Sequence, residues 1–134
     1  MQAIVFDATG QPLRLTDLQN PTPQPDQVLL QIAACGICGS DLHMTEDPVT
    51  FGIGQGMVLG HEFAGTVVAR GADVTTLAEG DRVAVAPMFG CGHCAACLSG
   101  DPAWCPQMRL IGGGYAEFTP SPPASAAFCP PMSP

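Results

Sequence analysis

The chain has 134 residues, which is enough for one domain with a hydrophobic core but is short for an enzyme that uses a cofactor. Twelve acidic residues oppose four basic ones, so the net charge is −8 and no basic patch is available for phosphate groups. Nucleic acids and anionic membranes are therefore excluded as expected partners. With no signal-peptide pattern and no apolar run of roughly 18 residues, we expect a cytoplasmic protein.

Short apolar runs bounded by turn residues indicate β-strands along most of the chain. These runs lie at residues 3–6, 13–18, 28–34, 63–69 and 83–86. Many short strands, glycine-containing turns and the lack of a long amphipathic helix favour a mainly β fold of the barrel type.

A short helix is predicted after the third strand, because the small and polar residues 39–41 are typical of a helix start. This helix places Asp41 near its positive end, carries His43 and is limited in length by Pro48. Four glycines in residues 52–60 then predict a mobile loop that leads to His61.

The composition changes after Phe118. Residues 119–134 contain six of the chain's 14 prolines, together with serine and alanine, and carry no charge. Such a sequence predicts a disordered tail without a packed core, so we divide the chain into a domain at 1–118 and a divergent tail at 119–134.

Four cysteines have the spacing of a closed, tetrahedral, all-thiolate zinc site. They are Cys91, Cys94, Cys97 and Cys105. Glycines in and beside the motif free the backbone to wrap around an ion, which predicts a structural zinc lobe at residues 90–106. Disulfides or free buried thiols are the alternatives, but the cysteine count of seven is odd and no signal peptide is present. His93 is expected to be a bystander, because four thiolates complete the tetrahedron.

A second, sparser constellation consists of Cys38, His61 and the adjacent Glu62. A catalytic zinc site usually has three protein ligands, so Cys38 and His61 need a third donor such as Glu62. The alternative is a buried cysteine and a histidine of the hydrophobic core.

Two other motif matches lack the necessary context. Residues 90–95 fit a dinucleotide-binding fingerprint as a string, but that fingerprint requires a preceding strand, a following helix and a later acidic residue. Cys35 and Cys38 have the spacing of a thioredoxin-like redox pair, but no βαβ pattern surrounds them.

The motifs together resemble one enzyme family. In order, they are Cys-Gly-Ile-Cys-Gly-Ser-Asp-Leu-His at 35–43, Gly-His-Glu at 60–62, Gly-Asp-Arg-Val at 80–83, and the four-cysteine motif. Over about residues 1–118 the chain resembles the GroES-like catalytic domain of the zinc-dependent medium-chain alcohol dehydrogenases. The resemblance implies a mainly β, GroES-like barrel with short helices and a zinc lobe. The family's Rossmann domain and its third catalytic zinc ligand have no counterpart in this sequence.

The resemblance also implies roles for individual residues. Cys38 and His61 would bind the catalytic zinc, and Asp41 would hydrogen-bond His61. Ser40 would take the proton of the substrate hydroxyl and His43 would pass it on. The remaining implied site residues are Glu62, a carboxylate that can approach the catalytic zinc, and the structural zinc ligands Cys91, Cys94, Cys97 and Cys105. Cys35 occupies no ligand position in the family.

The implied reaction is NAD(P)-dependent oxidation of a small alcohol or polyol, with hydride transfer to nicotinamide in a full-length, homo-oligomeric enzyme. Zinc is the expected cofactor of this chain, and NAD or NADP requires the missing domain, so we expect no activity from the chain alone. Two alternatives are a non-catalytic zinc-binding β domain used for protein interaction and the product of a frameshifted gene. The frameshift alternative rests on one back-translation into codons. When the codons for residues 119–134 are read in another frame, the resulting sequence resembles the segment that follows this domain in the family.

Overall fold

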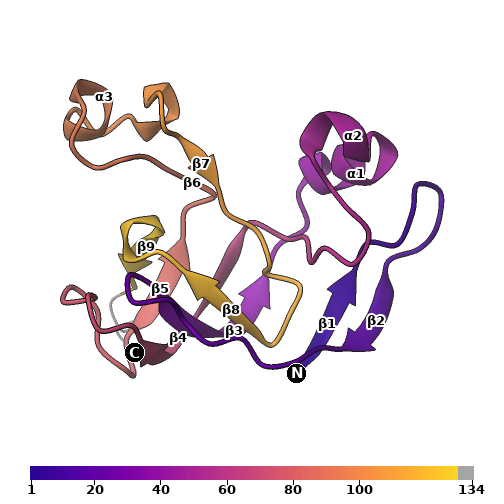
Figure 1. Cartoon of the computed structure of the whole chain (residues 1–134), viewed down its shortest axis with the longest axis horizontal. Helices are drawn as coiled ribbons and strands as arrows, with labels where there is room; N and C mark the ends of the chain where they lie inside the picture. The colour runs from indigo at the N-terminus through magenta and orange to yellow at the C-terminus, as the bar shows by residue number, and fades with distance from the viewer. Residues whose placement is uncertain (130–134) are drawn as a thin grey trace, which may run out of the picture.

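A five-stranded antiparallel sheet forms the centre of the computed structural model, which describes residues 1–129 (Figure 1). Its strand order is β8–β3–β4–β5–β9, formed by Phe118–Ser121, Val28–Cys35, Phe63–Arg70, Arg82–Val85 and Ala126–Phe128. Two small sheets pair β1 (Gln2–Val5) with β2 (Arg14–Asp17) and β6 (Met88–Phe89) with β7 (Arg109–Leu110). The predicted mainly β fold is confirmed, and each expected strand has its counterpart.

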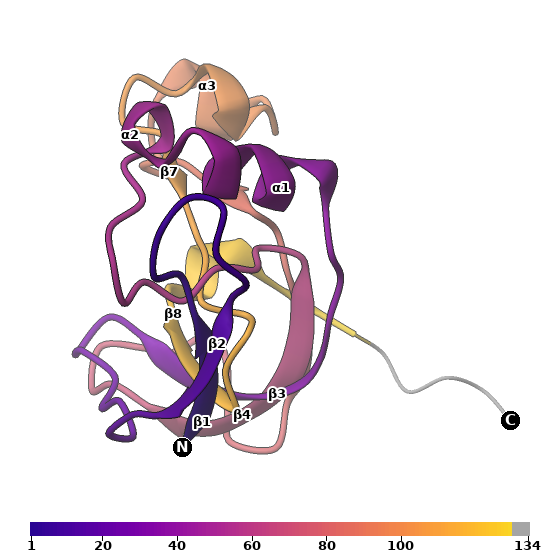
Figure 2. The same cartoon turned by 90° about the vertical axis from the view of Figure 1, so that its right-hand side faces the viewer.

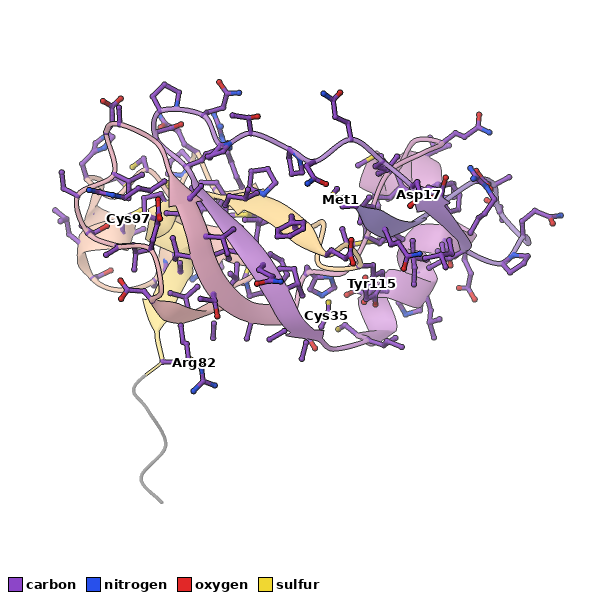
Figure 3. All side chains as sticks on the ribbon, turned by 90° about the horizontal axis from the view of Figure 1, so that it is seen from below. Met1, Asp17, Cys35, Arg82, Cys97 and Tyr115 are labelled. Atoms are coloured by element: carbon purple, nitrogen blue, oxygen red, sulfur yellow. The ribbon has the colours of Figure 1, made fainter. Side chains whose placement is uncertain are left out.

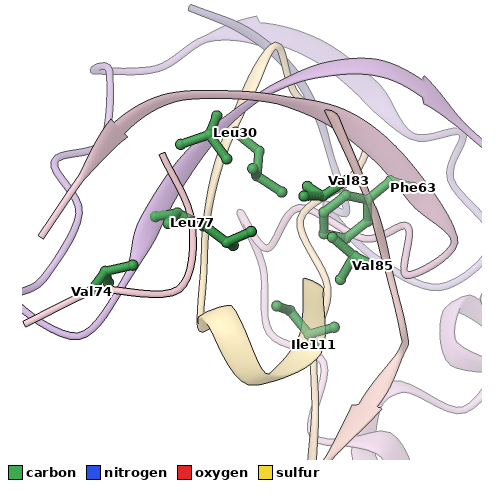
Figure 4. Packing of buried hydrophobic residues seen from close by; sticks show 9 residues of the cluster. Leu30, Phe63, Val74, Leu77, Val83, Val85 and Ile111 are labelled. Carbon is green, nitrogen blue, oxygen red and sulfur yellow. The ribbon is translucent and has the colours of Figure 1, made fainter. Parts of the chain in front are cut away.

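The two longest strands, β3 and β4, supply much of the core (Figure 4). Burial alternates along the start of β4, so Phe63, Gly65 and Val67 are buried while Ala64 and Thr66 are more exposed. Gly65 allows β4 to approach β3 closely, because a Cβ there would lie 2.3 Å from the carbonyl oxygen of Gln31. The core cluster consists of Val28, Leu30, Phe63, Val67, Val74, Leu77, Val83, Val85 and Ile111.

The predicted short helix is α1 (Gly39–Glu46), and α2 (Pro48–Phe51) follows it directly. Figures 1 and 2 show these helices on the same side of the sheet as a lobe that carries α3 (Ala95–Leu98) and the 3-10 helix η1 (Pro102–Trp104). Within the described residues, no helix has both the length and the apolar character needed to cross a bilayer.

The expectation of an unpacked tail is wrong for residues 119–129. β8 pairs with β3, the 3-10 helix η2 (Pro123–Ser125) follows, and β9 pairs with β5. The prolines fit this arrangement because β8 is an edge strand, where Pro120 needs no ladder donor, and η2 has proline in its first turn. Residues 130–134 lie outside the described part of the chain.

Two buried serines in this segment differ in their hydrogen bonding. Ser121 is fully buried and its hydroxyl has no partner among residues 1–129, whereas the Ser125 hydroxyl donates to the carbonyl oxygen of Pro122 at 2.7 Å. An unpaired buried hydroxyl costs about 1–3 kcal/mol, so Ser121→Ala should raise the free energy of unfolding by about 1 kcal/mol. The matched variant Ser125→Ala should lower it by about 1 kcal/mol. Denaturant unfolding of both variants measures these values, and a loss of stability in Ser121→Ala would contradict the assignment.

Candidate metal centres

Cys38, His61 and Glu62 form the first donor group. Each offers a ligand atom, and these atoms all lie within 4.8 Å of one another. Cys38 is the N-cap of α1, and His61 follows Gly60, whose φ of 82° ends the glycine-rich loop. The two expected ligands are thus brought together, and Glu62 is the third donor that the sequence left open.

Asp41 connects the two elements that carry these donors, and it is only 4% exposed. Its Oδ2 accepts a hydrogen bond from the backbone N–H of Cys38 at 2.9 Å. Its Oδ1 accepts one from the N–H of Gly60 at 3.3 Å and lies 3.4 Å from Nδ1 of His61. A carboxylate in this place fixes the orientation and tautomer of a metal-binding imidazole. With Nδ1 facing Asp41, Nε2 is the ring nitrogen of His61 that remains to act as a ligand, and it faces the Ser40 hydroxyl.

Ser40 and His43 lie differently on α1. The Ser40 hydroxyl is 3.2 Å from Nε2 of His61, so it borders the donor group. The side chain of His43 is 71% exposed, and its Nδ1 lies 3.6 Å from the Glu46 carboxylate. His43 therefore occupies the solvent-facing surface of the helix.

An apolar cavity of about 280 Å³ opens beside Ser40 and His61. Apart from these two residues, its lining is apolar and comes from α1, α2 and the strands at the base of the lobe. The apolar lining residues are Met44, Phe51, Pro87, Met88, Leu110 and Ile111. The cavity has room for a small organic molecule next to the donor group.

Tyr115 is the residue of this site that the sequence reasoning missed. Its hydroxyl donates to Oδ2 of Asp41 at 3.0 Å, and Figure 3 shows it near Cys35 at the end of β3. Burial, the hydrogen bond to Asp41 and the nearby negative charge raise the pKa of Tyr115 well above its ordinary value, so the hydroxyl stays protonated. No local motif marks this tyrosine, because its partner Asp41 is 74 positions away.

Cys35 belongs to neither donor group found within the described part of the chain. Its side chain packs against the hydrophobic core, and burial raises the pKa of its thiol. The N–H of Cys129 donates to the carbonyl oxygen of Arg82 beside β5, and its thiol is likewise outside both groups.

The second donor group consists of the four predicted cysteines, whose sulfur atoms also lie within 4.8 Å of one another. The Sγ atom of Cys97 lies 4.0 Å from that of Cys91 and 3.6 Å from that of Cys94. Four thiolates at about 2.3 Å from a zinc ion are about 3.8 Å apart, so the residues fit a tetrahedral site. Gly90 is required beside the sulfurs, because a Cβ there would lie 2.5 Å from Sγ of Cys97.

The thiols of this group titrate unequally. A hydrogen bond from the backbone of His93 is the main cause that lowers the pKa of Cys91 to about 6. At Cys97, a hydrogen bond from the backbone of Gly92 favours the thiolate, but burial and the neighbouring thiols raise the pKa to about 11. Cys91 therefore ionises before Cys97. The imidazole of His93 lies 2.9 Å from the carbonyl oxygen of Cys91 through Nδ1 and is outside the donor group.

Comparison with known proteins gives consistent results. Residues 24–131 match the family described as the alcohol dehydrogenase GroES-like domain, so the similarity extends beyond Phe118, where the sequence predicted that it stops. A "probable zinc-binding alcohol dehydrogenase" of Mycobacterium tuberculosis is 38% identical over 92% of this chain and 33% of its own length. An NAD-dependent alcohol dehydrogenase of Sulfurisphaera tokodaii is 36% identical over 88% of this chain and 37% of its own length.

Solved structures agree with the sequence relatives. The structure of AibC is 33% identical in sequence, with a TM-score of 0.91. The match covers 100% of this chain and 39% of the AibC chain. Galactitol-1-phosphate dehydrogenase from Escherichia coli has 32% identity, a TM-score of 0.86 and the same coverage of 100% and 39%. The chain thus spans about a third of the length of the curated relatives that it matches. It belongs to the zinc-dependent alcohol dehydrogenase family, as that family's N-terminal GroES-like domain.

Proposed function

We propose that this chain is the zinc-binding catalytic domain of an NAD(P)-dependent alcohol dehydrogenase. The observation that carries the proposal is the Cys38, His61 and Glu62 donor group, with Ser40 and an apolar cavity beside it. One sulfur, one imidazole nitrogen and one carboxylate are donor types that zinc accepts, and three protein ligands leave a fourth position for a substrate. A closed set of four thiolates is, in contrast, suited to a structural ion.

Each residue of the site has a defined task in the proposed reaction. A zinc ion at the donor group would supply Lewis acidity, which lowers the pKa of a hydroxyl bound to it. Ser40 is placed to accept the proton of the substrate hydroxyl, and Asp41 holds His61 in position. His43, on the exposed surface of α1, would exchange that proton with solvent. Hydride transfer to NAD or NADP completes the reaction, and we assign no nicotinamide contact to residues 1–129.

The cavity favours one class of alcohol within this proposal. Its lining contains no Asp, Glu, Lys or Arg side chain, and the only polar groups come from Ser40 and His61. A charged or highly hydroxylated substrate would lose its hydration there without gaining partners. We therefore favour a small alcohol with an apolar substituent over a polyol or a sugar phosphate.

Zinc titration tests the donor assignment. We expect one ion per chain to resist dialysis against a chelator, held by the four thiolates, and a second equivalent to bind more weakly at Cys38, His61 and Glu62. Cys38→Ala should remove the second equivalent and retain the first. Cys129→Ala is the matched control, because this cysteine belongs to neither donor group. The proposal fails if Cys38→Ala still binds the second equivalent, or if the Cys129 variant loses it.

A further inference from the structure

The Tyr115 hydroxyl completes the hydrogen bonding of the Asp41 carboxylate. Oδ2 accepts from the tyrosine hydroxyl at 3.0 Å and from the N–H of Cys38 at 2.9 Å. Oδ1 is thereby directed toward the N–H of Gly60 and Nδ1 of His61. With two donors on Oδ2, the carboxylate has little freedom to rotate away from the imidazole.

The tyrosine ring is itself held in place by close packing. Gly60 lies under the ring, because a Cβ there would be 2.6 Å from Cδ1 of Tyr115. The backbone N–H of Tyr115 donates to the carbonyl oxygen of Leu59 at 3.1 Å, and its own carbonyl oxygen accepts from Ile4 at 2.8 Å. The hydroxyl therefore comes from a position fixed both by β1 and by the loop that leads to His61.

We propose that Tyr115 is a positioning residue for His61, acting through Asp41. Its hydroxyl keeps Oδ1 of Asp41 aimed at Nδ1 of His61, so the imidazole keeps its proton on Nδ1 and presents Nε2 toward Ser40. The tautomer of His61 is a property of the metal-free chain, whereas the consequence for metal affinity rests on the proposed function. The raised pKa of Tyr115 supports this role, because a phenol that stays protonated remains a donor throughout the neutral range.

The first experiment measures the His61 tautomer in the metal-free chain by ¹H–¹⁵N long-range NMR. The wild-type imidazole should carry its proton on Nδ1. Tyr115→Phe removes only the hydroxyl and should populate the Nε2-protonated tautomer. Thr45→Ala is the matched control, because Thr45 lines a surface cavity together with Tyr115 and Asp41, but its hydroxyl donates to the carbonyl oxygen of Leu42. An unchanged tautomer in Tyr115→Phe, or an equal shift in Thr45→Ala, would overturn the proposal.

The second experiment measures Co²⁺ affinity at the Cys38 and His61 site by visible absorption, with the four-cysteine lobe loaded with zinc beforehand. Substitution of a residue that hydrogen-bonds to a metal ligand typically lowers metal affinity by about 10–100-fold. Tyr115 is one step further from the metal, so Tyr115→Phe should lower Co²⁺ affinity by about 3–10-fold. In an Asp41→Ala background, Tyr115→Phe should have no further effect on Co²⁺ affinity, because the carboxylate through which the tyrosine acts is absent. If the two substitutions lowered Co²⁺ affinity independently, so that their fold-changes multiplied in the double variant, action through Asp41 would be contradicted. If the wild-type chain binds no Co²⁺ at the Cys38 and His61 site, the proposed function fails. The His61 tautomer measured in the first experiment still decides the role of Tyr115 in that case.

Discussion

The variant Cys97→Ser is expected to lose zinc from the four-cysteine lobe and to unfold residues 90–106. Cys97 is central to this donor group, with sulfur distances of 4.0 Å to Cys91 and 3.6 Å to Cys94. Cys105 is the only buried residue in the lobe, so a hydrophobic core cannot replace the ion. Zinc binding contributes on the order of 10 kcal/mol in zinc-finger peptides, and most of that contribution should be lost here.

Metal analysis and limited proteolysis measure this effect. We expect the tightly held zinc ion to be absent from Cys97→Ser and cleavage to concentrate in the lobe, while the five-stranded sheet stays intact. His93→Ala is the matched control, since His93 is in the same segment but outside the donor group. Full zinc retention by the serine variant would show that three thiolates suffice and that the site is not a closed tetrahedron.

The variant Asp41→Ala should have the second large effect, on both stability and metal binding. The buried carboxylate accepts from the backbone of Cys38, the backbone of Gly60 and the hydroxyl of Tyr115. Each donor left unpaired costs about 1–3 kcal/mol, so we expect the free energy of unfolding to fall by about 3–5 kcal/mol. Affinity for metal at Cys38 and His61 should fall by about 10–100-fold, because the imidazole loses its orienting partner.

Asp47→Ala provides the control for this variant. Asp47 is the N-cap of α2 and, like Asp41, accepts from a backbone N–H at the start of a helix, that of Thr50, but it is exposed and belongs to no donor group. Its loss should cost about 1 kcal/mol, without any change in metal affinity. Chemical denaturation and Co²⁺ titration of the two variants separate the general effect of a missing cap from the specific role of Asp41. Equal losses in both variants would contradict that role.

The sequence predicted the features that depend on neighbouring residues. Strand β4 follows from its run of small and β-branched residues, and the clustering of four thiols from four cysteines on one short segment. Asp41 was correctly placed near the start of α1, because the helix signal at residues 39–41 is local. Glu62 was a candidate metal ligand because it is next to His61 in the sequence. Its closeness to Cys38, however, could be seen only in the folded structure.

The remaining features depend on contacts that no local pattern records. The hydrogen bond from Tyr115 to Asp41 exists only because residues 111–117 return beside the loop that ends at His61. The segment at 119–129 was misjudged because its composition is that of a disordered chain, whereas its prolines occupy an edge strand and a helix start. Composition describes what a segment contains, but its place in the sheet decides whether a proline is tolerated.

The hydrogen bond from the N–H of Cys38 to the Asp41 carboxylate, which closes the first turn of α1, has a further consequence for folding. The Cys38 and Asp41 groups that begin this helix also arrange the first donor group, because Cys38 belongs to it and Asp41 orients His61. An eight-residue helix is too short to be stable by itself. We therefore expect formation of this first turn and metal binding at the donor group to be coupled, so that metal occupancy would report local helicity. Any substitution that frays this turn is thus expected to appear first as weakened ion binding, before global unfolding is detectable.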